Sequence, residues 1–216
     1  MKDQQGDFLE LALSVGALRF GEFTLKSGRV SPYFFNAGQF ARGKAAAALS
    51  RYYANVLHAH YPGCDMLFGP AYKGIPLAAL AAASLADQHD IDLPYAFDRK
   101  EAKQHGEGGN IVGGPLQGSV VIIDDVITAG TAIRASVELI RAAGAEVGGV
   151  VISLDRQERG TGELSAVQEV EQTLGVKVTA IATLGSLVAH LQSKGSEKGH
   201  LEAILAYREA YGIADS

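Results

Sequence analysis

The chain has 216 residues, a length that suits one large α/β domain, and its 47% apolar and 20% charged residues are typical of globular proteins. A chain of this length can bury about 70% of its unfolded surface, so its core requires neither disulfides nor a structural metal. The net charge of −5 argues against a long-range attraction to nucleic acid or anionic membranes, so a phosphate site would have to be built locally. Glu10 interrupts the first apolar stretch, no apolar run approaches the ~20 residues of a membrane span, and Cys64 is a lone cysteine, which together predict a cytoplasmic protein.

The order of apolar runs predicts strands and helices in alternation. The chain is expected to begin with a helix over 7–15, a polar stretch over 21–43 with aromatic residues packed inside it, and a helix over 44–61. A strand over 65–68, a helix over 75–88 and strands over 94–97 and 119–123 follow. The last expected elements are a helix over 130–143, a strand over 146–154, a helix over 162–174 and a strand over 177–182. This alternation predicts one domain, residues 1–216, built on a mainly parallel sheet with helices on both faces. In such sheets ligands bind beyond the carboxyl ends of the strands. Residues 193–216 have the pattern of an amphipathic tail without an assigned role.

One predicted strand ends in two adjacent carboxylates, Asp124 and Asp125, and a short loop then opens a helix. The helix start offers free backbone N–H groups and the positive end of the helix dipole, roughly half a unit charge, which suits a phosphate. Thr128 and Thr131 add hydroxyl donors, and Gly130 lets the backbone approach closely. One alternative is an acidic strand end before an ordinary capped helix. A second, the acidic strand of a P-loop NTPase, fails because the chain has no Gly-x-x-x-x-Gly-Lys-Ser/Thr segment.

The apolar strand, its paired acids and the following Thr-Ala-Gly-Thr resemble a motif of the type I phosphoribosyltransferases, which bind phosphoribosyl pyrophosphate (PRPP). The resemblance implies that residues 128–132 hold the 5′-phosphate and that the two aspartates contact the ribose 2′- and 3′-hydroxyls. The part of the PRPP site implied by this motif comprises Asp124, Asp125, Val126, Ile127, Thr128, Ala129, Gly130, Thr131 and Ala132.

Two further loops carry residues suited to a polyphosphate. In the turn bounded by Gly69 and Gly74, Lys73 would stand near a helix N-terminus, which disfavours a cation unless an anion is bound; a tight turn with a solvated lysine is the alternative. The glycine-rich stretch over 98–115 concentrates basic residues in an acidic protein, which indicates a lid for a polyanion rather than a solvated charged face. The family resemblance implies that both loops bind PRPP, and that the second closes over it and reaches the neighbouring active site of a homodimer. The residues it assigns to them are Tyr72, Lys73, Arg99, Lys100, Lys103 and His105.

The segment over 23–36 indicates which base is used. Its Thr-Leu-Lys-Ser-Gly-Arg and the following Ser-Pro-Tyr-Phe closely resemble the signature of the orotate phosphoribosyltransferase family. Phe34 and Phe35 could wall a planar base, and Lys26 could neutralise an anionic base or the pyrophosphate; a core hairpin with a surface lysine is the alternative. Arg156 follows a predicted strand, and its planar guanidinium suits a carboxylate or a pair of ring oxygens, although a surface arginine is equally compatible with the pattern. The orotate site implied by the resemblance is Phe34, Phe35, Thr128 and Arg156.

Taken together, the resemblance implies an α/β type I phosphoribosyltransferase fold with a small base-binding hood, formed by about residues 1–40 with C-terminal elements. The implied reaction joins PRPP to orotate, giving orotidine 5′-monophosphate and pyrophosphate in pyrimidine biosynthesis. Its implied cofactor is Mg²⁺, bound mainly through PRPP, and its implied catalytic groups are Lys26, Lys103, His105, Asp124 and Asp125. The alternatives are transfer to another base, which leaves residues 23–36 unexplained, and a PRPP-sensing module, which has less need of a water-excluding lid.

Overall fold

The structure, a computed structural model, describes residues 4–25, 27–99, 110–160, 162–195 and 198–213. It contains one large sheet with strand order β5-β4-β3-β6-β7-β8 and a separate hairpin of β1 and β2. The strands of the large sheet are β3 (Met66–Gly69), β4 (Tyr95–Asp98), β5 (Ile111–Gly113), β6 (Ser119–Asp124), β7 (Glu146–Asp155) and β8 (Val178–Thr183). The edge strand β5 is antiparallel to β4, whereas the other neighbouring strands are parallel. The predicted mainly parallel sheet is therefore confirmed.

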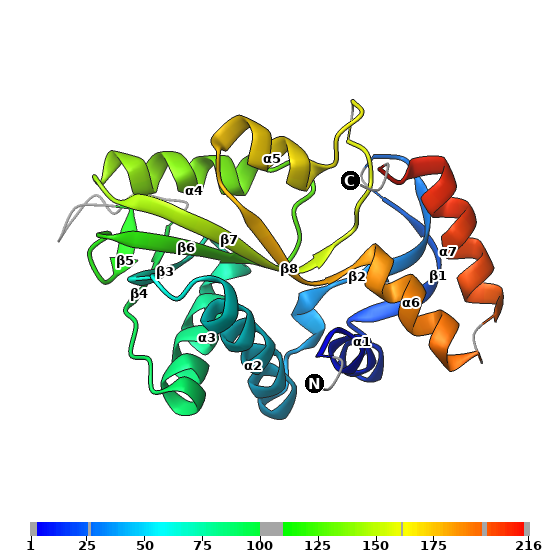
Figure 1. The fold of residues 1–216 in the computed structure, drawn as a ribbon, viewed down its shortest axis with the longest axis horizontal. Helices are drawn as coiled ribbons and strands as arrows, with labels where there is room; N and C mark the ends of the chain where they lie inside the picture. The colour runs from blue at the N-terminus through cyan, green and yellow to red at the C-terminus, as the bar shows by residue number, and fades with distance from the viewer. Residues whose placement is uncertain (1–3, 26, 100–109, 161, 196–197, 214–216) are drawn as a thin grey trace.

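Helices cover both faces of this sheet (Figure 1). The helices α2 (Gly43–His60) and α3 (Gly74–His89) lie on one face, and α4 (Thr131–Ala142) and α5 (Ala166–Leu174) lie on the other. In the central strand β6, Val121 and Ile123 join the buried cluster of α2 and α3. The alternate residues Val120 and Ile122 join the cluster of α4 and α5. Because both faces are buried, this strand is continuously apolar, and for that reason the sequence predicts it well.

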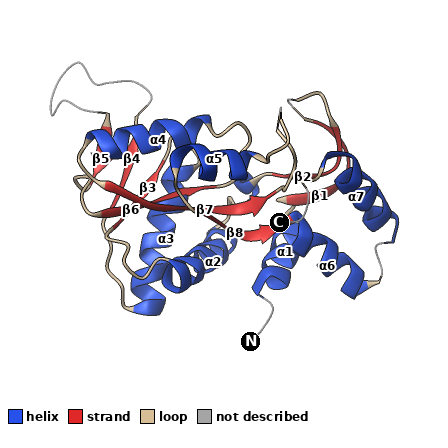
Figure 2. Ribbon diagram, turned by 45° about the horizontal axis from the view of Figure 1, so that its top comes forward, coloured by secondary structure: helices blue, strands red, loops and turns tan. Residues whose placement is uncertain are grey.

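The hairpin, three further α-helices and a short 3-10 helix lie together at one end of the sheet (Figure 2). These elements are α1 (Gln4–Ser14), β1 (Leu18–Thr24), β2 (Val30–Phe35), the short 3-10 helix Ala37–Gln39, α6 (Leu184–Lys194) and α7 (Lys198–Tyr211). Phe8 of α1, Leu187 of α6 and Tyr207 of α7 belong to the same buried cluster as α2 and α3. The first and last parts of the chain therefore pack together in this core.

Several boundaries and elements differ from the sequence-based expectations. The helix expected over 162–174 begins at Ala166, because Ser165 caps it reciprocally with Gln168. The short strand β5 was not predicted. The segment expected to be a tail is mostly the helix α7, which buries Ile204 against the core. The segment of the hairpin was predicted mainly as a polar stretch, with a core hairpin as the alternative, because Leu18 is the one buried residue of β1 and no clean alternation marks the strand.

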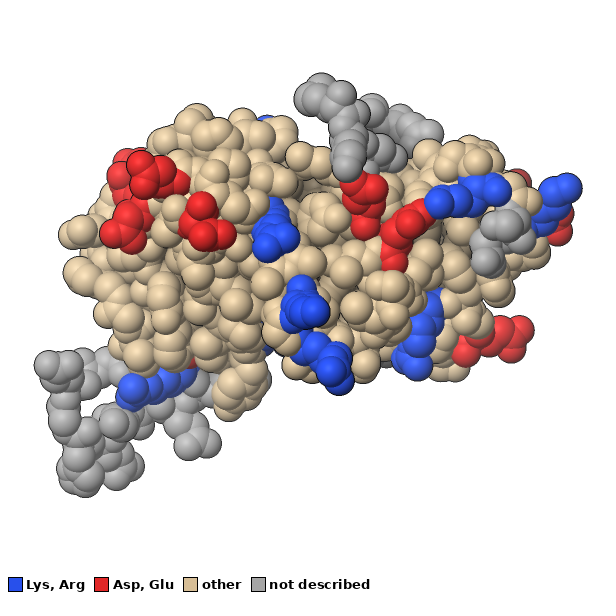
Figure 3. Space-filling model, turned by 90° about the horizontal axis from the view of Figure 1, so that it is seen from below, with Lys and Arg blue, Asp and Glu red and all other residues tan. Residues whose placement is uncertain are grey.

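No helix in the described ranges is long and apolar enough to cross a membrane. The face seen in Figure 3 carries acidic and basic side chains in small separate groups, with uncharged surface between them. This face therefore presents no broad field of one sign, in keeping with the modest net charge of −5.

Candidate active site

The strand β6 brings two buried carboxylates to the carboxyl edge of the large sheet. Asp124 is its last residue and Asp125 follows; they are 9% and 4% exposed. The Asp125 carboxylate accepts a hydrogen bond from Lys73 Nζ at 2.6 Å and another from the Val126 N–H at 2.9 Å. Asp124 Oδ1 accepts one from the Asp125 N–H at 2.9 Å. Three residues predicted from two separate loops, Asp124, Asp125 and Lys73, are thus brought to one point.

The Asp124 carboxyl group holds its proton more tightly than an ordinary aspartate. Burial, helped by the neighbouring Asp125 carboxylate, raises the pKa of Asp124 to about 7, while the Asp125 N–H and the Lys73 charge oppose the rise. Near neutral pH, Asp124 is therefore divided between a protonated form that donates a hydrogen bond and an ionised form that accepts them. A sugar hydroxyl, which can both donate and accept, is a suitable partner for either form.

The raised pKa of Asp124 predicts a pH-dependent loss of stability that Asp124→Asn removes. The folded-state pKa lies at about 7 and the ordinary value is 3.8. The contribution of Asp124 to the unfolding free energy is therefore fully present below about pH 4 and is lost as the pH rises toward 7. The unfolding free energy of the wild type should therefore fall relative to that of the variant across this window. Urea unfolding of the wild type and the variant at a series of pH values measures this difference in unfolding free energy. Parallel curves for wild type and Asp124→Asn would contradict the prediction.

Tyr53 of α2, which the sequence analysis did not single out, hydrogen-bonds the end of β6. Its hydroxyl donates to the Asp124 carbonyl at 2.7 Å and lies 2.6 Å from Ser153 Oγ on β7. Tyr53 and Ser153 are fully buried, and the Ser153 N–H donates to the Asp125 carbonyl at 2.9 Å. The backbone of both acids is thus fixed before any ligand arrives. A tyrosine on the apolar face of a helix is usually a core residue, so no sequence signal could have distinguished it.

The loop between β6 and α4 leaves the start of the helix open to an anion. Gly130 precedes α4 with φ 68°, and a Cβ there would lie 2.9 Å from Cγ2 of Val170, so both backbone and packing require glycine. No side chain caps this helix, so its first N–H groups remain for a ligand. The solvent-exposed residues here are Thr128, Ala129, Thr131 and Ala132. The side chains of Val126 and Ile127 instead pack against the core.

The turn between β3 and α3 is closed so tightly that its bounding glycines admit no side chain. A Cβ on Gly69 would lie 2.2 Å from the Gly74 carbonyl oxygen, and a Cβ on Gly74 would lie 2.7 Å from the Ile123 carbonyl oxygen. The turn therefore packs directly against the end of β6, and this places Lys73 beside Asp125. The side chain of Lys73 remains 56% exposed and can also reach a ligand.

Asp98, at the end of β4, supports the same turn. Its Oδ1 accepts a hydrogen bond from the Ala71 N–H at 2.6 Å. The peptide bond between Ala71 and Tyr72 is cis, and Tyr72 is 67% exposed. The sequence analysis did not assign Asp98 a role, although its place at the carboxyl end of a predicted strand could have drawn attention to it.

Phe34 and Phe35 lie on opposite sides of β2. The Phe34 ring stacks on Phe23 with centroids 5.4 Å apart, and the Arg19 guanidinium carbon lies 5.9 Å from its centroid. Phe35 is 6% exposed, and its ring packs 6.3 Å from that of Phe8 in the core. The two rings therefore do not form one wall, because adjacent residues of a strand point to opposite faces. Of the two rings, that of Phe34 faces away from the core, and Phe35 could contact a ligand only through its backbone groups.

Arg156 follows β7 directly and is held in a fixed position. Its side chain is 13% exposed, and its Nε and Nη2 lie 2.9 and 2.6 Å from Glu158 Oε1. Nη2 also donates to Ser31 Oγ at 3.0 Å, and the guanidinium carbon lies 4.3 Å from the Tyr33 ring centroid. Arg156 is therefore not a solvated surface arginine but an ordered cation between the large sheet and the hairpin.

Four predicted site residues, Lys26, Lys100, Lys103 and His105, lie outside the described residues. Arg99 borders them, and its N–H donates to the Asn110 carbonyl at 2.7 Å. The backbone is thus paired at the two ends of segment 100–109. Among the residues that the structure describes, no group of three or more His, Cys, Asp or Glu side chains could hold a metal ion.

Known proteins resemble this chain along its whole length. The family model for the phosphoribosyl transferase domain matches residues 36–178. The orotate phosphoribosyltransferase of Klebsiella pneumoniae is 61% identical over 213 residues, covering 99% of this chain and 100% of that protein. That of Vibrio parahaemolyticus is 58% identical with the same coverage. The crystal structure of the Francisella tularensis orotate phosphoribosyltransferase has a TM-score of 0.86 and 42% identity, covering 95% of this chain and 99% of that one.

Proposed function

We propose, from the premise that this chain belongs to the orotate phosphoribosyltransferase family, that the carboxyl edge of its large sheet is the active site. The chain transfers the phosphoribosyl group of PRPP to orotate, giving orotidine 5′-monophosphate and pyrophosphate in pyrimidine biosynthesis. The observation that carries the assignment of the site is the meeting of Asp124, Asp125 and Lys73 beside the uncapped start of α4. The relatives named orotate phosphoribosyltransferase, 58% and 61% identical over 99% of this chain, favour this reaction over transfer to another base and over a non-catalytic sensor.

Residues 128–132 are proposed to bind the 5′-phosphate. The uncapped N–H groups at the start of α4 and the hydroxyls of Thr128 and Thr131 are donors, and the helix dipole favours the negative charge. Asp124 and Asp125 would then receive the ribose hydroxyls. Their backbone is fixed by Tyr53 and Ser153, so a sugar meets preorganised oxygens.

The turn with Tyr72 and Lys73 is proposed to bind the pyrophosphate of PRPP. Lys73 is paired with Asp125 but remains half-exposed, so it can contact an anion while it stays near the carboxylate. Arg99 stands at the edge of the neighbouring segment, and the family pattern adds Lys26, Lys100, Lys103 and His105. A cluster of cations compensates the charge that builds on the departing pyrophosphate.

Orotate is proposed to lie between the loop at Thr128 and the hairpin. The Phe34 ring would offer an apolar surface to the planar base, and the backbone N–H and C=O groups of Phe35 would be available to hydrogen-bond it. Arg156 is an ordered cation between the sheet and the hairpin, and its planar fork suits the anionic base.

The reaction of the family uses PRPP, which is consistent with a metal requirement, and we propose Mg²⁺ as the metal. Mg²⁺ usually keeps several waters and binds through one or two carboxylates together with substrate phosphates. Asp124 and Asp125 supply such carboxylates at the proposed PRPP site. The described residues do not form a complete set of metal ligands, so they suit a metal ion that is bound mainly by PRPP. When bound, the ion would supply positive charge at the leaving pyrophosphate.

The mechanism follows from where charge develops. The bond between ribose C1 and the pyrophosphate oxygen breaks, the leaving group takes the electron pair, and the base nitrogen forms the new bond to C1 and releases its proton to the departing pyrophosphate or to water. Bonding to the positively charged C1 makes this proton acidic, so the chain needs no strong base. Lys73 and the other cations meet the growing negative charge, while Asp124 and Asp125 lie beside the sugar, which becomes positive. The lid proposed over 99–110 would exclude water, which competes with orotate for C1.

We further propose a homodimer in which the 99–110 loop completes the active site of the neighbouring subunit, and a cytoplasmic location. The grounds are the family resemblance for the dimer and the lone cysteine and chain composition for the location.

The test is consumption of orotate, followed by ultraviolet absorbance, with PRPP and Mg²⁺ together and with each omitted. We expect loss of absorbance only in the complete mixture, with pyrophosphate formed in equal amount. Turnover without added divalent ion in the presence of a chelator would contradict the metal proposal. Binding of PRPP in calorimetry without consumption of orotate would contradict the assignment of orotate as the acceptor.

A further inference from the structure

We propose that Glu158 is a positioning residue for orotate, which fixes Arg156 and links it through Tyr207 to the C-terminal helix α7. This inference rests on the proposed function, in which Arg156 contacts the base. It gives a role to a carboxylate and a helix that the reaction itself does not require.

The Glu158 carboxylate is the centre of a mostly buried network. Its side chain is 11% exposed, and its Oε1 accepts from Arg156 Nε at 2.9 Å and from the Tyr33 hydroxyl at 3.2 Å. Its Oε2 accepts from the Tyr207 hydroxyl at 3.1 Å. Burial raises the pKa values of both tyrosines, so they remain hydroxyl donors at neutral pH. One carboxylate therefore joins β2, the segment after β7 and α7.

This network determines how Arg156 can be used. Nε and Nη2 are engaged by Glu158 and Ser31, and the guanidinium lies over the Tyr33 ring. The Tyr207 hydroxyl also hydrogen-bonds the Arg156 side chain. An arginine held by these contacts keeps its guanidinium plane in one orientation, which lowers the entropy lost when it binds a ligand.

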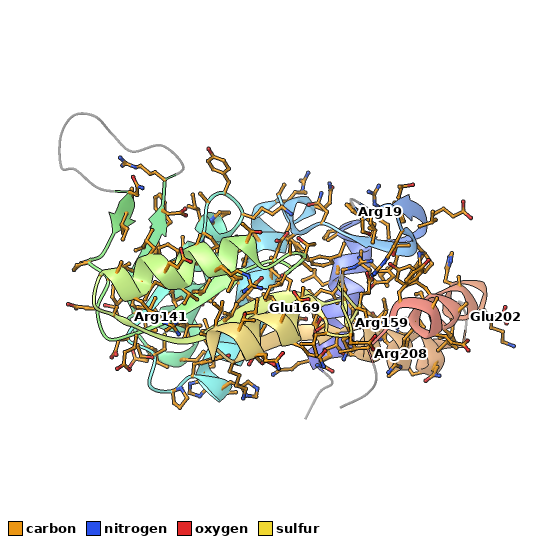
Figure 4. The ribbon with its side chains drawn as sticks, turned by 90° about the horizontal axis from the view of Figure 1, so that it is seen from above. Arg19, Arg141, Arg159, Glu169, Glu202 and Arg208 are labelled. Atoms are coloured by element: carbon orange, nitrogen blue, oxygen red, sulfur yellow. The ribbon has the colours of Figure 1, made fainter. Side chains whose placement is uncertain are left out.

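The surrounding backbone shows that α7 and this segment are built as one unit. The Arg159 N–H donates to the Tyr211 carbonyl at 2.8 Å, and Arg159 Nη2 donates to the Ala210 carbonyl at 2.6 Å. The Arg29 guanidinium, from the connection between β1 and β2, donates to the Arg159 carbonyl at 2.7 Å. Figure 4 shows Arg159 beside α7, with Arg208 of that helix close by. A change in α7 can therefore be transmitted to Arg156 through Glu158.

The test compares Michaelis constants for the two substrates in the full-length enzyme. In Glu158→Ala we expect the KM for orotate to rise about 10-fold or more, as for loss of one charge-assisted hydrogen bond, while the KM for PRPP stays within about 2-fold. Glu158→Gln, which keeps an acceptor oxygen of similar size, should recover part of the orotate affinity. Tyr207→Phe should raise the orotate KM by less, and Tyr211→Phe, which removes a hydroxyl one turn along the same helix, should leave it unchanged.

Two results separate this inference from the function on which it rests. If Arg156→Ala leaves the orotate KM unchanged, the proposed contact of Arg156 with orotate is wrong. If Arg156→Ala raises it but Glu158→Ala and Glu158→Gln do not, the contact stands and the positioning role is wrong. Equal changes in both Michaelis constants would also overturn it, since they indicate a general structural effect. Thermal unfolding of each variant identifies one that fails to fold, and Glu158→Gln then carries the test.

Discussion

Asp125→Asn is expected to lower kcat/KM for PRPP by about 10²–10³-fold, the loss seen when one preorganised charge-stabilising group is removed from an active site. The asparagine oxygen can still accept from the Val126 N–H, but the amide carries no charge to hold Lys73, whose Nζ lies 2.6 Å from the carboxylate. The substitution therefore removes a proposed partner of the ribose and, at the same time, releases the lysine proposed to bind pyrophosphate. Initial rates at varied PRPP with saturating orotate measure the effect.

A matched control is Asp65→Asn, which makes the same chemical change near the opposite end of the neighbouring strand. Asp65 Oδ2 accepts a hydrogen bond from the Ser119 N–H at 2.8 Å, and an asparagine oxygen can still do so. This variant should retain wild-type kinetics. Asp125→Asn with kcat/KM within about 3-fold of wild type and an unchanged melting temperature would show that Asp125 does not hold PRPP.

Gly69→Ala is expected to abolish measurable turnover and to destabilise the fold by about 1–3 kcal/mol, the usual cost of forcing atoms into a packed site. The added methyl group would stand 2.2 Å from the Gly74 carbonyl oxygen and 3.0 Å from the Ala78 Cβ. Since the first of these is backbone, the turn must open, and Lys73 moves away from Asp125. Urea unfolding gives the free energy, and the orotate absorbance assay gives the turnover.

Gly63→Ala is the control for this change. A Cβ at Gly63 meets nothing within 4 Å, and its backbone φ is not in the left-handed region, so the variant should fold and turn over as wild type. If Gly69→Ala keeps wild-type turnover, then the tight closure of the turn is not needed to place Lys73. If it loses stability but not activity, the turn matters for folding alone.

The sequence predicted the large sheet and its helices well, for a local reason. The strand β6 is apolar at every interior position because both of its faces are buried, so it can be recognised as a strand from its own residues alone. The hairpin was not predicted as two strands, since only Leu18 of β1 is buried. The position of α7 was also beyond the sequence, because its buried residues Ile204 and Tyr207 find partners far away in the chain.

The same division holds for the active site. The sequence by itself determined the loop proposed to bind PRPP, because Asp124, Asp125 and the start of α4 are contiguous, and strand, loop and helix N-terminus follow one another. Only the tertiary structure decided that Tyr53 holds the Asp124 carbonyl and that Tyr207 reaches Glu158, contacts that span 71 and 49 residues. It also decided that Phe34 and Phe35 face opposite ways. The physical reason is that a hydrogen bond between distant segments depends on how whole helices and strands pack, which the spacing of residues within one segment does not predict.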